Sequence, residues 1–109
     1  MLSEGLETNT KLTDLFFTHN DLQELGDAGV AFIRTLHNKK DLRSLALNSC
    51  NLNGPLLEEL QNALEKHDAL QELYLFANKI EAKHAKHISA ILKNKNELSA
   101  LGLSNNKLD

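Results

Sequence analysis

This sequence has few of the residues on which many folds and activities depend. One cysteine among 109 residues excludes an internal disulfide and a zinc site built from several cysteines, and it is compatible with a reducing compartment. Aromatic residues make up only 5% and tryptophan is absent, so the core of this single domain must be aliphatic. No segment approaches the roughly 20 consecutive apolar residues of a membrane span. The formal net charge of −3 gives no basic excess of the kind that nucleic-acid-binding domains carry.

Motifs that carry catalytic chemistry are also missing. The chain has no glycine-rich phosphate loop, no Gly-x-Ser-x-Gly and no His-Glu-x-x-His. Two of its histidines stand three residues apart, but no third ligand follows at a spacing that suits a metal. We therefore predict that the protein is not an enzyme, binds no metal or cofactor, and turns its histidines to solvent. These histidines are His19, His37, His67, His84 and His87.

Leucine, in contrast, is abundant and follows a repeating pattern. The pattern Leu-x-x-Leu-x-apolar-x-x-(Asn or Cys)-x-apolar occurs four times, opening at Leu12, Leu42, Leu70 and Leu98. The openings are 30, 28 and 28 residues apart, so the first repeat has two additional residues, which we place in a bulge between Asn20 and Leu25. Further apolar positions recur six and ten residues before each opening leucine, and the pattern therefore covers the whole chain.

Each repeat is predicted to consist of a strand, a turn, a helix and a return. The Leu-x-Leu of each segment places both leucines on one face of a short strand, because side chains alternate with a period of two. Between residues 52–64 and 80–92 the apolar positions have helical spacing. Asp27 and Asn53 are expected to start helices, and Pro55 suits a first helical turn.

One polar column follows the strand segments, at Asn20, Cys50, Asn78 and Asn106. We expect the chain to turn inward there, which removes backbone groups from water. An Asn amide can both donate to and accept from such groups, and a Cys fits the same place with a weaker S–H donor. We interpret Cys50 as a structural residue rather than as a redox or nucleophilic thiol.

These segments resemble the leucine-rich repeat, and the 28-residue period with a helical second half resembles its ribonuclease-inhibitor-like subclass. The resemblance implies an α/β solenoid, a right-handed horseshoe segment with parallel strands on the concave side and helices on the convex side. Residues 1–109 would form one such domain, with a partial helix over 1–11 and an incomplete last repeat. We expect a fragment of a longer array, with self-association possible through its uncapped ends.

The strand positions that point away from the leucines are the predicted binding surface. We expect partner contacts from Asp14, Phe16, Thr18, Asn48, Glu72, Tyr74 and Phe76, with Ser44, Ala46, Ala100, Gly102 and Ser104 facing solvent beside them. Three of the five aromatic residues fall on this face, where exposed aromatic rings beside carboxylates could anchor a protein. The alternative is that these rings only cover the sheet and each other.

The resemblance implies a protein-interaction module that binds a protein partner through the concave face. One alternative is a regulator of a small GTPase, which would need a dedicated polar residue on a loop. The two arginines, Arg34 and Arg43, are predicted on a helix and at a strand start and do not suit that role. Another alternative is a repeat fragment without activity of its own. The implied location is intracellular, in the cytoplasm of a eukaryote or inside host cells as a secreted effector.

Residues 79–95 carry five lysines and one acid, a local balance of +4 that could indicate a nucleic-acid or lipid site. A simpler interpretation is that neighbouring helices present opposite charges to each other. At an offset of 28 residues, Glu58 lies level with Lys86 and Glu65 with Lys93. We therefore expect neither nucleic acid nor a membrane as a partner.

Overall fold

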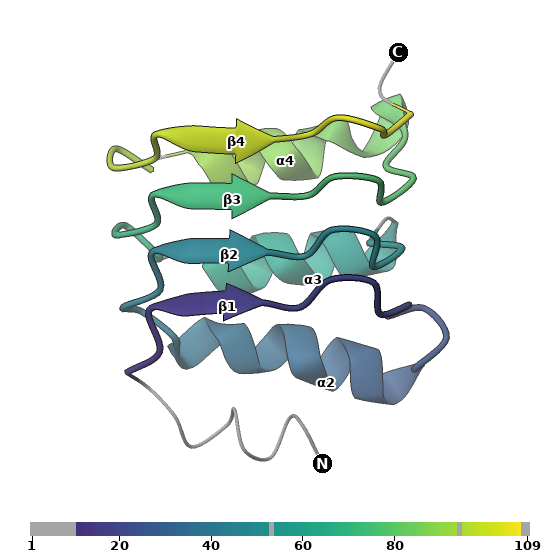
Figure 1. Cartoon of the computed structure of the whole chain (residues 1–109), viewed down its shortest axis with the longest axis horizontal. Coiled ribbons are helices and arrows are strands. Elements are labelled where there is room, and N and C mark those ends of the chain that lie inside the picture. The colour runs from purple at the N-terminus through teal and green to yellow at the C-terminus, as the bar shows by residue number, and fades with distance from the viewer. Residues whose placement is uncertain (1–10, 53, 94, 108–109) are drawn as a thin grey trace.

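A computed structural model describes residues 11–52, 54–93 and 95–107. Four short strands of this part of the chain form one parallel sheet in the order β1-β2-β3-β4 (Figure 1). The strands are β1 (Asp14–Phe16), β2 (Ser44–Ala46), β3 (Glu72–Tyr74) and β4 (Ala100–Gly102). The prediction of a mixed α/β chain with parallel strands is confirmed.

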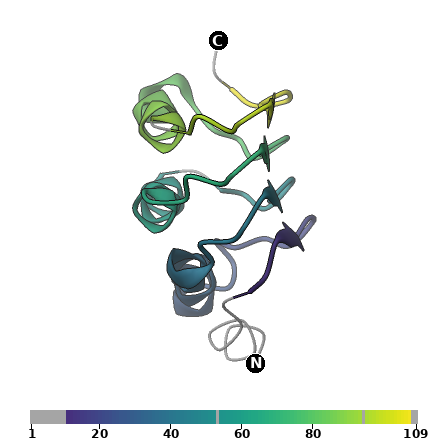
Figure 2. The same cartoon turned by 90° about the vertical axis from the view of Figure 1, so that its left-hand side faces the viewer.

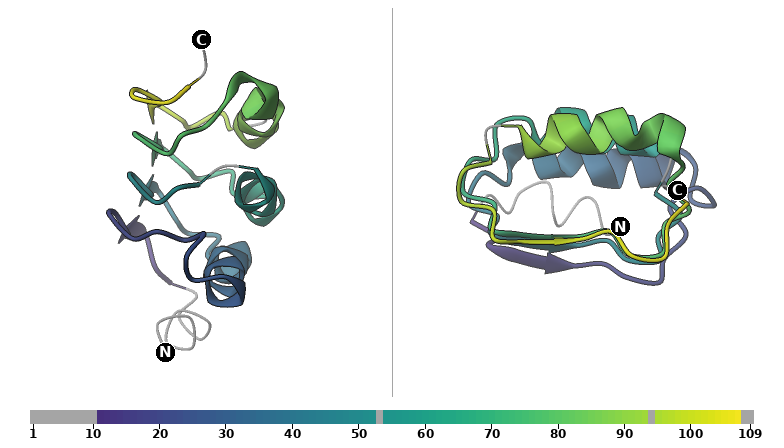
Figure 3. Two further views of the ribbon diagram at one scale, coloured as in Figure 1. Left: turned by 90° about the vertical axis from the view of Figure 1, so that its right-hand side faces the viewer. Right: turned by 90° about the horizontal axis from the view of Figure 1, so that it is seen from above.

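Helices cover one face of this sheet, as the edge-on views show (Figures 2 and 3). They are α2 (Asp27–Thr35), α3 (Pro55–Leu64) and α4 (Ala85–Leu92), with short 3₁₀ helices η1 (Leu36–Asn38) and η2 (Ala82–His84). The helix expected over 80–92 begins with the 3₁₀ helix η2 and continues directly as α4. None of the helices in the described part of the chain has the length and apolar content needed to cross a membrane.

The strand register follows the sequence repeat. Leu15, Leu45, Leu73 and Leu101 are partners across the sheet, and so are the residues before and after them. We refer to residues 12–41, 42–69, 70–97 and 98–107 as the first to fourth repeats. The three-residue strands leave each repeat dependent on its neighbours, since an isolated pair of such strands is unstable in water.

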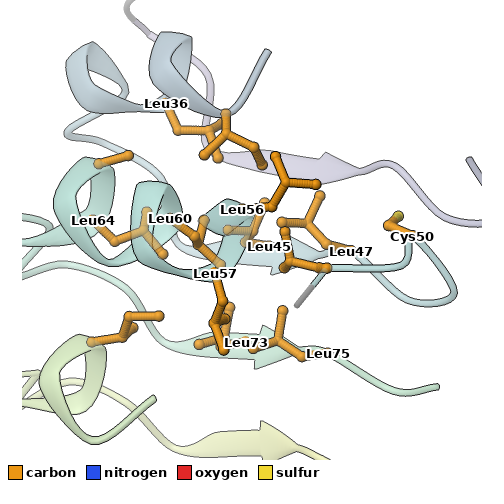
Figure 4. Close-up of a cluster of buried hydrophobic side chains, with 14 of the residues drawn as sticks. Leu36, Leu45, Leu47, Cys50, Leu56, Leu57, Leu60, Leu64, Leu73 and Leu75 are labelled. Carbon is orange, nitrogen blue, oxygen red and sulfur yellow. The ribbon is translucent and has the colours of Figure 1, made fainter. Parts of the chain in front are cut away.

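Leucines from three repeats meet between the sheet and the helices (Figure 4). Leu57 and Leu60 of α3 are fully buried, as are Leu45 and Leu73 of the strands. The equivalent Leu101 of β4 is 39% exposed, because no further strand of the described residues lies beside it. Burial of a leucine contributes about 1.5–3 kcal/mol, so the inner repeats supply most of the stability.

The turns after the strands use left-handed backbone at a fixed place in each repeat. His19, Ser49, Ala77 and Asn105 have φ values of 59°, 57°, 57° and 61°. Such a conformation costs a non-glycine residue roughly 1–2 kcal/mol and must be stabilised by its surroundings. These turns direct the next residue, the polar column of Asn and Cys, toward the interior.

The additional residues of the first repeat lie in the turn that precedes α2. Gly26 occupies the N-cap of α2 with φ 58°, and Gly54 occupies the same place before α3 with φ 53°. Asp27 is thus the first helical residue rather than the cap, because the chain enters the helix through a left-handed residue that favours glycine. Pro55 begins α3 as predicted, whereas Asn53 and the partial helix expected at the N-terminus lie largely outside the described residues.

The same turn packs tightly against α2 at a second glycine. A Cβ atom on Gly29 would lie well inside van der Waals distance of the carbonyl oxygen of Leu22. Only a residue without a side chain allows this close approach of backbone to helix. The bulge that the sequence predicted between Asn20 and Leu25 is thereby accommodated without displacing β1.

Candidate protein-binding face

The side of the sheet that faces away from the helices carries all seven residues predicted to contact a partner. Register places Asp14, Ser44, Glu72 and Ala100 in one row and Phe16, Ala46, Tyr74 and Gly102 in the next. Parallel backbone bonding continues past the strands, for example from His19 N–H to Asn48 O at 2.9 Å. It therefore places Thr18, Asn48, Phe76 and Ser104 in a third row. We call these three rows the outer sheet face.

Aromatic side chains on the outer sheet face differ in how far they are covered. Phe16 is 65% exposed. Tyr74 and Phe76 are half-buried and stack on each other, with ring centroids 6.0 Å apart and an angle of 17° between the planes. Both interpretations of these residues thus find support, because one ring is open to solvent while two cover each other.

Phe76 also lies directly over Gly102 on the neighbouring strand. A Cβ atom at Gly102 would collide with the Phe76 ring. Gly102 is buried although it points to the solvent side of the sheet. The sequence did not indicate this contact, although a glycine inside a strand is a recognised sign of close approach by another group.

Two small residues of β2 were expected to face solvent, and that expectation is wrong. Ser44 is 6% exposed and Ala46 is 5% exposed. Each lies in register between larger side chains on β1 and β3, and Ser44 Oγ donates a hydrogen bond to Glu72 Oε1 at 2.9 Å. In the middle of the outer sheet face, the small side chains of β2 are therefore covered by the larger side chains of β1 and β3.

The polar residues of this face also have structural bonds. Asn48 Oδ1 accepts the backbone N–H of Phe76 at 2.6 Å, which holds the third row together. Asp14 is exposed, whereas Glu72 is half-buried. The carboxylates of Asp14 and Glu72 lie in the same row, two residues before Phe16 and Tyr74 on the same strands. The outer sheet face therefore combines negative charge with aromatic surface.

The polar column behind the strands bonds each repeat to the preceding one. Asn106 Oδ1 accepts the N–H groups of Asn78 and Ile80 at 2.8 and 3.1 Å, and its Nδ2 donates to Leu75 O at 2.8 Å. Each amide thus provides both the donor and the acceptor that the turn requires. This geometry fixes the spacing between strands and so positions the outer sheet face.

Cys50 occupies the same place with fewer bonds. Its Sγ donates to Phe17 O at 2.8 Å, in the first repeat. Burial raises the pKa of the Cys50 thiol, which disfavours the reactive thiolate. Asn20, the remaining member of the column, is exposed, and within the described residues its side chain donates to Thr18 O at 2.8 Å.

The helical side differs from the predicted charge arrangement. Glu58 and Lys86 line one hollow and Glu65 and Lys93 another, but neither expected ion pair forms. Their exposed side chains have little to gain from a fixed geometry. Instead Arg34 donates two hydrogen bonds of 3.0 Å to Glu59 across α2 and α3.

Histidine burial also departs from expectation at one position. His67 is fully buried, so the prediction that all five histidines face solvent is wrong there. His84 and His87 stack with ring centroids 6.2 Å apart, and His87 Nδ1 lies 2.6 Å from Gln61 Oε1. In the described part of the chain, no group of three or more His, Cys, Asp or Glu could hold a metal ion.

Comparison with known families points to the same repeat. Residues 41–63, which include β2 and most of α3, match the family model described as Leucine Rich Repeat. This segment of the chain is therefore similar to a leucine-rich repeat. Comparison with curated protein sequences found no match.

A solved structure of the tropomodulin C-terminal domain from Caenorhabditis elegans is similar to this chain. The TM-score is 0.72 over 97% of this chain, at 13% sequence identity, so the likeness is one of fold. This chain spans 66% of the length of that structure. The repeat match and the shared fold both support a fold of the leucine-rich repeat kind.

Proposed function

We propose that this chain is a protein-interaction module that binds a protein partner of basic character through the outer sheet face. In this proposal the repeats are of the ribonuclease-inhibitor-like subclass, and the outer sheet face is the concave side of a horseshoe. The observation that carries the proposal is the 65% exposure of Phe16, a large apolar ring, on the same face as the Tyr74–Phe76 stack. Exposed aromatic residues are frequent anchors of protein interfaces.

The acidic residues of the outer sheet face favour a basic partner. Asp14 and Glu72 lie one row from the aromatic residues, and the small residues Ser44 and Ala46 separate the two sides of the face. Carboxylates beside aromatic rings favour Lys or Arg on a partner, because the cation can pair with the carboxylate while its stem or plane packs on a ring. The partner would therefore present a basic side chain flanked by apolar ones.

Selection from a displayed library of random peptides, with the whole chain as bait, tests this proposal. We expect the selected peptides to be enriched in Lys and Arg and to perturb the NMR amide signals of the outer sheet face. Phe16→Ala and Tyr74→Ala should each weaken binding about tenfold or more, as expected for anchors. The matched control is Leu25→Ala, because Leu25 is an exposed apolar residue (48%) outside this face.

Two results would contradict the proposal. Selected peptides could bind the Phe16 and Tyr74 variants as tightly as the unchanged chain. Alternatively, the amide signals that the peptides perturb could belong to residues of the helices. In both cases the alternative that the rings only cover the sheet would be favoured.

A further inference from the structure

A buried basic residue recurs where each helix returns to the next strand. Lys39, His67 and Lys95 stand 28 residues apart, each three residues before the opening leucine of the next repeat. Their exposed fractions are 0%, 0% and 6%. Basic side chains are rarely buried to this extent without a specific partner. The column is therefore a feature of the repeat rather than an isolated exception.

Two of these side chains, His67 and Lys95, reach the end of the helix in the preceding repeat. His67 Nε2 lies 2.7 Å from the carbonyl oxygen of Leu36, the C-cap residue of α2. Lys95 Nζ donates to the carbonyl oxygen of Glu65, the C-cap residue of α3, at 3.4 Å. Donors at this place satisfy carbonyl groups that the helix leaves without partners and oppose the helix dipole. His67 thus bonds the second repeat to the first, and Lys95 bonds the third repeat to the second.

His67 differs from the two lysines because it can lose its charge near neutral pH. A carbonyl oxygen only accepts, so Nε2 carries the hydrogen that is donated to Leu36. The other ring nitrogen, Nδ1, is then an acceptor, and it is buried without a hydrogen-bond partner. Protonation would turn Nδ1 into a buried donor with no acceptor and would place a charge inside the fold.

The charges that act on His67 from neighbouring repeats are all basic. They are Lys40 and His37 from the first repeat and Lys95 from the third. On its own segment Glu65, Lys66 and Asp68 are exposed, and the two acids act on Lys95. Burial is the main reason why the pKa of His67 is lowered, and the bond to Leu36 opposes this shift only in part.

We propose that His67 forms an acid-sensitive contact that holds the first and second repeats together. When His67 is uncharged, its bond to Leu36 holds the end of α2 against the segment that follows α3. When acid protonates it, the buried contact with Leu36 is lost and the first repeat separates from the rest. Histidine is the residue type of this column whose ordinary pKa lies between pH 5 and 8, so we assign the effect to this junction.

The direction of the effect follows from proton linkage. The unfolded chain protonates His67 near its ordinary pKa of about 6.5, whereas the folded chain does so at a lower pH. Below pH 6.5 the unfolded state therefore binds more protons, and stability falls as pH falls. A single group of this kind raises the unfolding equilibrium constant up to about tenfold per pH unit.

One consequence for binding rests on the proposed function. Asp14 and Phe16 lie on β1, in the first repeat, whereas Glu72 and Tyr74 lie on β3. Release of the first repeat would divide the outer sheet face and remove its most exposed aromatic ring. A partner held at neutral pH would then dissociate in acid.

Urea unfolding of the whole chain at pH 7.5, 6.5 and 5.5 tests the acid-sensitive contact of His67 without any partner. His67→Gln keeps a side-chain N–H for Leu36 but does not titrate, so its stability should depend less on pH, by up to about tenfold in equilibrium constant per unit. His37→Gln is the matched control, because His37 is exposed and near the same junction. It should retain most of the pH dependence of the unchanged chain, because the charge of His37 is the smallest of the influences on His67.

A nitrogen-15 NMR titration of the unchanged chain gives an answer even if the Gln variant does not fold. His67 should remain the neutral Nε2–H tautomer at pH 6. Ordinary titration of His67, or equal pH dependence in the His67→Gln and unchanged chains, would overturn the proposal. Neither measurement uses the outer sheet face, so failure of the proposed binding would be a separate result.

Discussion

The side chain of Asn78 bonds to the backbone of Cys50 in the preceding repeat, where Oδ1 accepts the Cys50 N–H at 2.8 Å. The same oxygen accepts the N–H of Leu52 at 3.0 Å, and Nδ2 donates to Leu47 O at 2.8 Å. One buried amide therefore satisfies three backbone groups of a turn that water does not reach. This relationship explains why neighbouring repeats stack in one register.

Replacement of Asn78 by Ala should lower the free energy of unfolding by about 3–5 kcal/mol. The variant leaves the N–H groups of Cys50 and Leu52 and the carbonyl of Leu47 without their partner, at about 1–3 kcal/mol each. Urea unfolding followed by circular dichroism measures the loss. Asn20→Ala is the matched control and should cost less than about 1 kcal/mol, because Asn20 is exposed and its bond among the described residues stays within its own repeat. Similar losses in both variants would contradict this account of the column.

Gly29→Ala should destabilise the chain although Gly29 lies inside a helix. Alanine normally stabilises a helix relative to glycine by about 0.5–1 kcal/mol. Here the new Cβ would collide with the backbone of Leu22, and we expect a net loss of about 1–3 kcal/mol. Asn62→Ala, at an exposed position of α3, should be neutral or slightly stabilising. A more stable Gly29→Ala variant would show that the turn before α2 moves freely.

Two leucines at the same repeat position should respond differently to truncation. Leu73→Ala, on the inner strand β3 and fully buried, should cost about 2–5 kcal/mol. Leu101→Ala, on β4 and 39% exposed, should cost about 1 kcal/mol or less. Thermal or urea unfolding of both variants gives the comparison. Equal costs would mean that Leu101 is covered in solution, for example by another copy of the chain.

The exposed edge of the sheet predicts that the chain associates as its concentration rises. Leu101 lies on β4, whose outer edge pairs with no other strand of the described residues. Unpaired strand edges and exposed leucines favour contact with another chain. Light scattering over a range of concentrations, with circular dichroism on the same sample, measures this.

Charge substitutions identify the surface responsible. Leu101→Glu should give a monomer, because a carboxylate opposes pairing at the edge. Leu25→Glu, at an exposed leucine in the turn before α2, should leave association unchanged. A monomeric unchanged chain at high concentration would contradict the prediction and would indicate a self-contained recognition domain.

Much of the fold was predictable because the same pattern of apolar residues occurs four times in the sequence. The 28-residue spacing of leucines defined strands, helices and their parallel register, since each unit can bury its leucines only against the next. The inward direction of Asn78 was also predictable, because only a group that donates and accepts satisfies a buried turn. Basic residues also recur every 28 positions, at 39, 67 and 95. Because basic residues between a helix and a strand are usually exposed, this spacing did not predict their burial.

The binding face was predictable in composition and less so in form. Alternation along the strands assigned Phe16, Tyr74 and Phe76 to one side of the sheet. It could not show that Phe76 lies over Gly102, or that Ala46 is covered between Phe16 and Tyr74. Those facts depend on side-chain directions and on the size of residues from strands that are distant in sequence.

By itself, then, the sequence determined the repeating strand–helix architecture, the aliphatic core and the side of the sheet on which each strand residue stands. Periodicity carries this information because it is local and repeated. Only the tertiary structure decided that His67 is buried against Leu36, that Gly29 must lack a side chain and that Phe16 is open while Phe76 is covered. The contacts of His67 and Phe76 join different repeats, and the contact of Gly29 joins the turn at Leu22 to α2 within the first repeat. In each case the atoms come together only after the chain has folded.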